Sequence, residues 1–466
     1  MAGIGFELEK LFEKDTYSAD TSAYLTAGFV LAGPWVFGVL AILLITSASF
    51  GALSPLDQTV FLVLATLSYA VGMFVTAALY LPVTRFVADR LYAGHADSFG
   101  PCYAACSLLH WLLAVPAALL LLSGADLSPV ARLATVVMVL ACTQIWTSAT
   151  FVALLRTYVP VAVSFLAGYA VSAGGAVFLA RSHGLDGALV GFAAGLSLLA
   201  VILTTTLMAQ FAFPAHVNFG FLRTLAARPA LAVIGLALAV GTWGDKFVFW
   251  HSEHALLVAG SLRYYPPYDM SFFLGYITVI PAYAHFLLRI ETSFARHVRH
   301  VYQTLVGREP YEQIRRGKAH MLAAMNQDYV SLLKVQAPVT LLCVHFAPAA
   351  LAKLGLPLAQ AHIVQFSAIA AAGIVILQVQ ILYLLYFDLA EHAVVPALVY
   401  GVANPVLTWV SLSLGYATFG LGHLIAAFAA ATVGIWIVNR QAPQLEKLTL
   451  VHYAERTLGL TRAGTP

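Results

Sequence analysis

The chain has 466 residues, of which 61% are hydrophobic and only 10% are charged, and its mean hydropathy is +0.85. A soluble domain carries about 25% charged residues, so this composition excludes a water-soluble globular protein and indicates a polytopic membrane protein. The net charge of +3 is too small to predict binding to nucleic acid.

Twelve apolar stretches are long enough to cross a bilayer, because a membrane-spanning helix needs about 20 predominantly apolar residues. We therefore predict an all-α, polytopic membrane protein with 12 transmembrane helices. The predicted spans are 21–49, 58–88, 103–123, 130–157, 159–180, 185–210, 229–251, 271–294, 329–350, 361–388, 392–415 and 417–438. Pro34 and Pro281 lie inside the first and eighth spans, where we expect kinks. The residues before the first span lack the apolar core of a cleavable signal peptide.

The basic residues predict which side of the membrane each loop faces. With both termini in the cytoplasm, 19 of the 24 Lys and Arg residues lie on the cytoplasmic side, as the positive-inside rule requires. The five on the outer side are Arg132, Arg181, Lys246, Arg263 and Lys353. The predicted segments are a cytoplasmic amphipathic segment at 1–20, an N-lobe of six spans at 21–210, a cytoplasmic connector at 211–228, a C-lobe of six spans at 229–438 with a polar cytoplasmic loop at 295–328, and a cytoplasmic tail at 439–466.

The stretch VGTWGDKFVFWH (Val240–His251) places an acid and a base side by side near the end of the seventh span. Asp245 follows Pro229 by roughly 24 Å along a helix, so we expect it in the outer half of the hydrocarbon core. Adjacent residues on a helix do not face each other, and Lys246 is long enough to reach the outer headgroups. Asp245 needs a partner on another helix, a water-filled cavity or a position at the interface. The sequence leaves these possibilities open.

Two further stretches lie at the ends of predicted spans. RIETSF places Arg289 and Glu291 at the inner end of the eighth span, where a cytoplasmic gate and a helix-end anchor are both compatible with them. RYYPPYD (Arg263–Asp269) groups three tyrosines beside an outer loop. They fit an interfacial aromatic belt or the lining of an exit. The candidate residues for a substrate pathway are Asp245, Lys246, Trp243, Arg289, Glu291, Trp146 and Arg156.

No motif predicts catalysis or metal binding. WHSEHA (Trp250–Ala255) lacks the spacing of two histidines one helical turn apart that zinc proteases use, and Cys102 and Cys106 have no second pair to complete a metal site. No stretch has the length of a soluble catalytic domain. We therefore expect neither an enzyme nor a metalloprotein.

Three stretches together resemble the PelG family, the inner-membrane transporters of the Pel exopolysaccharide system in Gram-negative bacteria. They are MAGIGFELEKLFEKDTY (Met1–Tyr17), GTWGDKFVFW (Gly241–Trp250) and RIETSF (Arg289–Phe294). The resemblance covers essentially the whole chain. The family is similar to the MOP flippase superfamily, which implies a MATE-like fold with two six-helix lobes around a central cavity.

The resemblance implies translocation of a growing polymer rich in N-acetylgalactosamine across the bacterial inner membrane, for a biofilm matrix. It implies a cytoplasmic glycosyltransferase, PelF, as a partner, together with the membrane proteins PelD and PelE, and no cofactor. Arginine-rich inner loops and the N-terminal segment are natural docking surfaces for such partners, although the N-terminal segment also fits a helix lying on lipid. The candidate docking residues are Phe6, Leu8, Arg296, Arg299, Arg315 and Arg316.

Two alternatives remain open from the sequence. The first is an ion-coupled antiporter or flippase of a small molecule or a lipid-linked sugar, in which Asp245 would bind the ion. No predicted span carries a cluster of acids, which weighs against this class because such carriers need acids deep in the membrane. The second is a scaffold that holds a synthase at the membrane through the polar inner loop.

Overall fold

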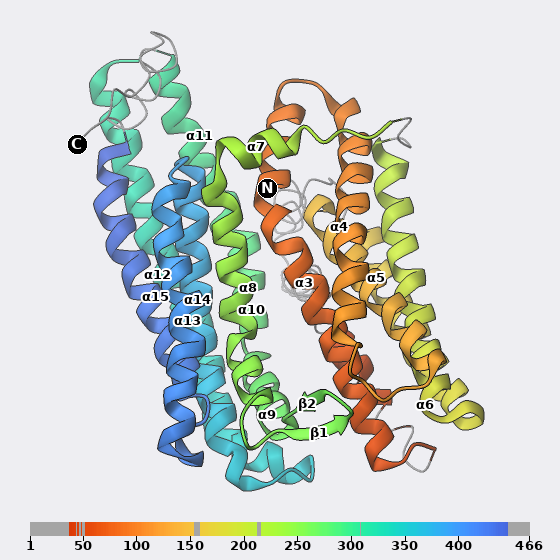
Figure 1. Ribbon diagram of the computed structural model, residues 1–466. Helices are drawn as coiled ribbons and strands as arrows, with labels where there is room; N and C mark the ends of the chain where they lie inside the picture. Colours follow the sequence, from red (N-terminus) through yellow and green to blue (C-terminus); the bar gives the residue numbers. More distant parts are fainter. Residues whose placement is uncertain are drawn as a thin grey trace.

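The computed structural model describes residues 37–42, 44–45, 48, 52–152, 159–211, 216–307 and 309–445 (Figure 1). The α-helices and strands are α3 (Pro55–Tyr92), α4 (Phe99–Leu121), α5 (Pro129–Val152), α6 (Val159–Phe211), α7 (Phe221–Ala227), α8 (Pro229–Trp250), β1 (Leu256–Ala259), β2 (Leu262–Tyr264), α9 (Pro266–Tyr276), α10 (Val279–His285), α11 (Thr292–Val306), α12 (Tyr311–Lys353), α13 (Ala361–Tyr386), α14 (Ala390–Leu414) and α15 (Leu421–Gln441). The short helical turns are Ala96–Ser98, the π-helical turn Phe286–Glu291, Leu358–Gln360, Tyr416–Thr418 and Ala442–Gln444.

Ten helices in the described part of the chain are long and apolar enough to cross a membrane. One of these candidate spans, Pro160–Phe211, has 52 residues, or about 78 Å of helix, which is enough for two crossings of a core about 30 Å thick. Gly184 interrupts it with a φ of 56°, a conformation that favours glycine. The two arms then pack together, because Gly175 and Gly191 let their backbones approach closely.

The predicted fifth and sixth spans therefore correspond to the two arms of α6. The predicted first span lies mostly outside the described residues, as does Pro34, so the number of 12 spans stays a prediction. The eighth span is a broken run of α9, α10, the π-helical turn and α11. The break before α10 falls at Ile277 and Thr278. Pro281 explains the break, because proline has no backbone N–H to donate to the carbonyl of Ile277, four residues earlier, and its ring clashes with that carbonyl.

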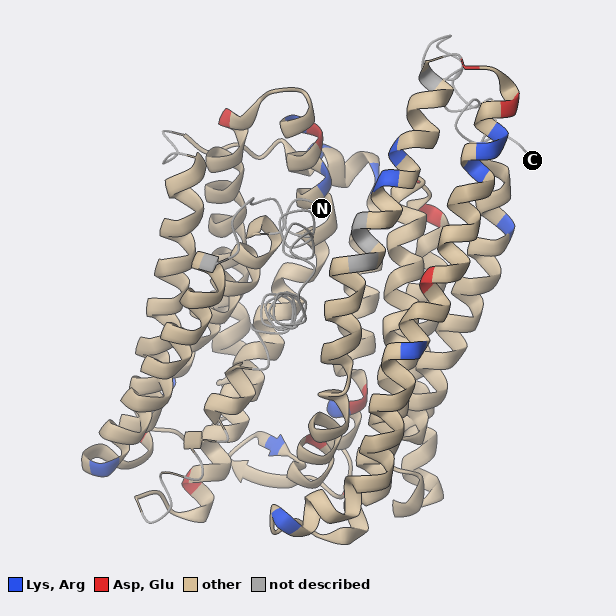
Figure 2. Cartoon of the chain, turned by 180° about the vertical axis from the view of Figure 1, so that it is seen from behind, with Lys and Arg blue, Asp and Glu red and all other residues tan. Residues whose placement is uncertain are grey.

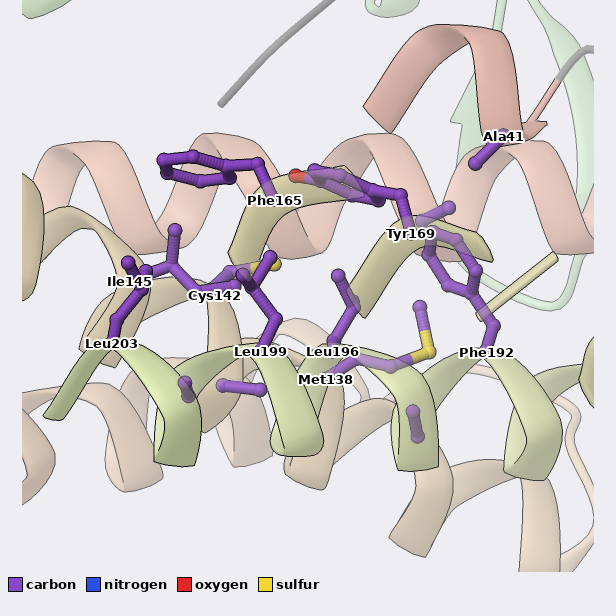
Figure 3. Packing of buried hydrophobic residues seen from close by; sticks show 14 of the residues in the cluster. Ala41, Met138, Cys142, Ile145, Phe165, Tyr169, Phe192, Leu196, Leu199 and Leu203 are labelled. Carbon is purple, nitrogen blue, oxygen red and sulfur yellow. The ribbon is translucent and has the colours of Figure 1, made fainter. Parts of the chain in front are cut away.

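The described helices pack around two large hydrophobic clusters. The first is made mostly of residues from α3, α4, α5 and α6, and it extends to the hairpin, the end of α8 and the π-helical turn. Figure 3 shows how Met138 and Cys142 of α5 face Leu196 and Leu199 of α6. The second joins α8 with α10 to α15. We call these the α3–α6 group and the α8–α15 group. The lobe boundaries at 210 and 229 stay predictions.

The two groups meet where α3 packs against α8. A Cβ atom on Gly235 of α8 would collide with the carbonyl oxygen of Ala77 in α3. Small residues allow this close approach of two helices. The boundary between the two groups is therefore tightly packed where Gly235 meets Ala77.

The ends of the molecule differ in structure. The helix α7 and the turn between α11 and α12 lie at one end, which we call the α7 end, and β1 and β2 lie at the other, which we call the hairpin end (Figure 1). Charged residues gather toward both ends, whereas the middles of the helices carry few (Figure 2). The predicted orientation would place the α7 end in the cytoplasm.

The strands are a departure from the predicted all-α fold. The loop expected between the seventh and eighth spans contains an antiparallel hairpin in which Leu256 pairs with Tyr264 and Leu257 with Arg263. Gly260 makes the turn with a φ of 61°, which a residue without a Cβ atom adopts at little cost. The next helix then begins at Pro266, five residues before the predicted start of the eighth span.

Candidate functional site

Asp245 of α8 lies at the centre of a buried polar cluster. Its side chain is fully buried, with an exposed fraction of 0%. The Tyr268 hydroxyl of α9 donates a hydrogen bond of 2.6 Å to Asp245 Oδ2, and His423 Nδ1 of α15 lies 3.4 Å from the same oxygen. Among the possibilities left open by the sequence, the structure therefore shows pairing between helices and not an interfacial anchor.

Lys246 neutralises this carboxylate. Its ammonium group lies 3.2 Å from both carboxylate oxygens of Asp245 and donates a hydrogen bond of 3.1 Å to the carbonyl of Thr242. It also lies 3.7 Å from the centre of the Phe272 ring, where a cation is attracted to the aromatic face. The side chain is only 13% exposed. Lys246 thus folds back along its own helix instead of extending to the outer headgroups.

Aromatic rings close the cluster toward the hairpin end. Phe249 stacks on Tyr268 with ring centres 3.9 Å apart, and Phe419 meets Phe249 edge-on at 4.9 Å. Trp250 donates a hydrogen bond of 2.8 Å to Asp269. Tyr268 is completely buried, so it does not belong to a lipid-facing belt.

A groove of about 670 Å³ lies beside this cluster, between α3, α8 and α14. Its lining is mostly apolar and includes Phe74, Phe247 and Trp409, with His251 and Glu253 toward the hairpin end. Gly244 lines the groove, whereas its neighbour Asp245 does not. The charged cluster and the groove are therefore separate features on two sides of α8.

The other pathway candidates are divided between the two groups. Trp243 joins the Asp245–Lys246 region to α3, because its indole NH lies 3.2 Å from the sulfur of Met73 and its ring lies 6.0 Å from the Lys246 ammonium. Trp146 is half-buried on α5, which packs in the α3–α6 group.

The structure leaves three pathway candidates without a described side chain. Arg289 and Glu291 belong to the π-helical turn, and their side chains lie outside the described residues. Arg156 also lies outside them, as do the docking candidates Phe6 and Leu8.

The remaining docking candidates are exposed at the α7 end. Arg296 and Arg299 lie on α11, and Arg315 and Arg316 lie at the start of α12. Both arginines of α12 pair with Glu312, at 3.1 and 3.2 Å.

A second ionic cluster at the α7 end was not predicted. The guanidinium of Arg228, just before α8, forms a two-pronged ion pair with Asp388 in the turn between α13 and α14. Arg85 of α3 lies 3.4 Å from the same carboxylate. This cluster joins the α3–α6 group to the α8–α15 group. Each of its residues lies at the end of an apolar stretch, where the sequence alone indicates a solvated anchor.

His423 and Asn404 were also missed. Asn404 donates a hydrogen bond of 2.7 Å to the carbonyl of Gly241 and so ties α14 to α8 beside the Asp245 cluster. Both are single polar residues inside long apolar runs. That is the signal that could have identified them, since polar groups in a membrane need partners.

Comparison with known proteins gives the family and the fold. No curated protein shows significant sequence similarity to this chain. A structure described as MATE in the straight conformation superposes with a TM-score of 0.61 and 11% identity over 91% of this chain and 96% of the other. The inward-facing conformation of a multidrug resistance MATE family transporter of the MOP superfamily gives a TM-score of 0.57 and 12% identity over 90% and 99%.

A MOP superfamily transporter from Pyrococcus furiosus, whose binding pocket is described as having reversed polarity, gives a TM-score of 0.54 and 12% identity over 91% of this chain and 96% of the other. At these identities the similarity shows the fold alone, and it confirms the predicted MATE/MOP-like architecture. The family profile of the PelG exopolysaccharide exporters (EPS-E) matches residues 1–450. That match covers nearly the whole sequence and confirms the resemblance, so the chain belongs to the PelG exopolysaccharide exporter family.

Proposed function

We propose that this chain carries the Pel exopolysaccharide across the bacterial inner membrane as a glycosyltransferase makes it. The family match over residues 1–450 is the observation that carries this proposal. The MATE-like fold supports it, because that fold belongs to multi-pass transporters. The polymer would pass between the α3–α6 group and the α8–α15 group.

The charges along this boundary fit a largely neutral, acetylated polymer. Asp245 is fully buried and is neutralised by Lys246, so α8 presents no unpaired charge to this boundary at their position. Aromatic side chains such as Trp243 can stack on the apolar faces of sugar rings. A dense ring of charge would suit an ionic substrate better, and the described middles of the helices carry few charges (Figure 2).

The shape of α12 supports docking of a soluble partner at the α7 end. Lys334 and Lys353 are separated by about 28 Å of helix, which matches the hydrocarbon thickness. The 43-residue helix begins at Tyr311, so about 35 Å of it precedes Lys334. This part packs on α11 through Met321 and Met325. It would stand well beyond the headgroups, within reach of a cytoplasmic glycosyltransferase such as PelF.

The test is secretion by a deletion strain. Removing the gene should leave the glycosyltransferase in the cell and abolish secreted Pel, and a plasmid copy of the chain should restore secretion. Normal secretion in the deletion strain would rule the proposal out. A variant that lacks residues 308–320 separates docking from transport: it should remain in the membrane but no longer co-purify with the glycosyltransferase.

The buried Asp245 cluster favours a second candidate function, ion-coupled antiport of a small molecule or a lipid-linked sugar. A carboxylate between Tyr268 and His423, on three different helices, is a plausible place for an ion to bind. The Lys246 ammonium already occupies the position that a cation would take, which counts against this function. The Asp245→Asn variant tests this function, since unchanged transport at every pH would remove Asp245 as the coupling site.

A further inference from the structure

The hairpin of β1 and β2 connects the two helix groups at the hairpin end. It leaves the α8–α15 group at the end of α8 and returns to it at the start of α9. Between these points its tip reaches the α3–α6 group, where the backbone NH of Ser261 donates a hydrogen bond of 2.8 Å to the carbonyl of Gly124. Figure 1 shows the two strands crossing from the foot of α8 and α9 toward α3.

The hairpin has one face packed on the α3–α6 group and one face exposed. Val258, Leu262 and Tyr264 are 9%, 3% and 5% exposed and belong to the first hydrophobic cluster. On the other face Leu257 is 66% exposed and Arg263 is exposed. A strand pair with this alternation has a specific docking face, so the contact with the α3–α6 group is a packed interface.

The contact at the tip depends on two glycines. A Cβ atom on Gly260 would collide with the carbonyl oxygen of Gly124, and a Cβ atom on Gly124 would lie 2.8 Å from the hydroxyl of Ser261. The loop that receives the tip is itself fixed, because Arg132 of α5 donates a hydrogen bond of 2.7 Å to the carbonyl of Ala125. The tip therefore packs on a loop of the α3–α6 group that is itself fixed by this hydrogen bond.

The base of the hairpin is fixed in the opposite group. Trp250, the last residue of α8, donates a hydrogen bond of 2.8 Å to Asp269 in the first turn of α9, and its ring lies 5.9 Å from that of Tyr264. The base is thus anchored to the α8–α15 group through Trp250 and also touches α3 through Tyr264, whereas the tip is held by a single described backbone hydrogen bond and a small apolar face. The tip is the part of the hairpin that can release.

We propose that the hairpin Leu256–Tyr264 is a strap that closes the outer end of the transport path, and that its tip must leave Gly124 for the polymer to emerge. This inference rests on the proposed export function. Because the strap spans from one helix group to the other, a polymer that leaves between the groups has to displace it.

A cross-link between Gly124→Cys and Ser261→Cys tests the strap directly. A Cβ atom on residue 124 lies 2.9 Å from the Ser261 Cβ, and a disulfide needs about 3.5–4.5 Å, so a shift of about 1 Å permits the bond. The background carries Cys343→Ser, since the other three cysteines are buried. We expect the oxidised double variant to secrete about tenfold less polymer than either single variant, with recovery after reduction.

Two outcomes would overturn the strap. One is normal secretion by the oxidised double variant, and the other is no cross-link even with added oxidant, which contradicts the contact at the tip. Failure of the export function is recognised separately, because the deletion strain would then secrete normally.

A labelling experiment covers the case in which the cysteine pair folds poorly. Val258→Cys lies on the docked face and should react slowly with an impermeant maleimide when polymer synthesis is switched off, and several-fold faster during export. Leu257→Cys, on the exposed face, is the matched control and should react at the same rate in both states. Equal rates for Val258→Cys in both states would overturn the proposal.

Discussion

Removal of the Lys246 charge should destabilise the chain more than removal of both charges of the Asp245–Lys246 pair. The variant Lys246→Met leaves a carboxylate that is 0% exposed without its cation. At 3.2 Å and an effective dielectric constant of about 20, the attraction that is lost is roughly 5 kcal/mol. Breaking a buried pair at one member costs about 3–5 kcal/mol, so we expect a loss of that size in the free energy of unfolding.

The variant Asp245→Asn should cost less, about 1–3 kcal/mol. Its amide oxygen can still accept from Tyr268, and Lys246 keeps the Thr242 carbonyl and the Phe272 ring as partners. In the double variant neither a lone anion nor a lone cation remains. Its loss should therefore be smaller than the sum of the two single losses by at least about 2 kcal/mol.

The assay is reversible unfolding of the purified chain in mixed micelles, measured for the wild type, both single variants and the double variant. The exposed pair Glu312–Arg315, whose side chains are 48% and 62% exposed, supplies the matched control. A coupling of no more than about 0.5 kcal/mol is expected there, because water screens exposed pairs. Additive effects at Asp245 and Lys246 would refute the reasoning, since they would mean that the two charges do not stabilise each other.

Three further changes probe other contacts. Asp388→Asn removes the carboxylate shared by two arginines at the α7 end and should lower the free energy of unfolding by about 1–3 kcal/mol, measured in the same micelles. Gly235→Val places methyl groups against the carbonyl of Ala77 and should separate α3 from α8, which a lower yield of folded protein in size-exclusion chromatography would show. Arg315→Glu together with Arg316→Glu should reduce co-purification with the glycosyltransferase and leave the melting temperature within a few degrees of the wild type, because both side chains are exposed.

The membrane spans could be predicted because hydropathy is a local property of the sequence. The two arms of α6 illustrate this: two apolar stretches separated by SHGLDG (Ser182–Gly187) predict two crossings, and the structure has its break at Gly184. The hairpin was missed although its signal was present. Apolar residues flank Gly260 and Ser261, a two-residue turn of the kind that joins antiparallel strands, but the stretch is short and lies between two strong helices, whose hydropathy dominates the prediction.

The polar pairs could not be predicted, because their members are far apart in the sequence. Asp245 and His423 are 178 positions apart, and Arg228 and Asp388 are separated by 160. Each residue alone is compatible with an anchor in the headgroups, and only the order of the helices in space makes one a partner of the other. The position of the Lys246 ammonium could not be predicted for a different reason. Its side chain has the length to reach either the headgroups or the carboxylate beside it, and the buried position of Asp245 decides between them.

The contacts between the helix groups at the two ends of the molecule differ in strength, and this difference bears on how the path would open. At the α7 end Asp388 binds two arginines from both groups, whereas at the hairpin end the Ser261–Gly124 hydrogen bond and one apolar face hold the tip. A charge-assisted pair is roughly twice as strong as a neutral hydrogen bond, yet water can replace it at an exposed end, since Asp388 is 34% exposed. The apolar face of the hairpin has no such replacement in water. Opening the hairpin end would therefore expose Val258 and Leu262 to water, at a free-energy cost that grows with the apolar area exposed, so the strap stays closed until the emerging polymer displaces it.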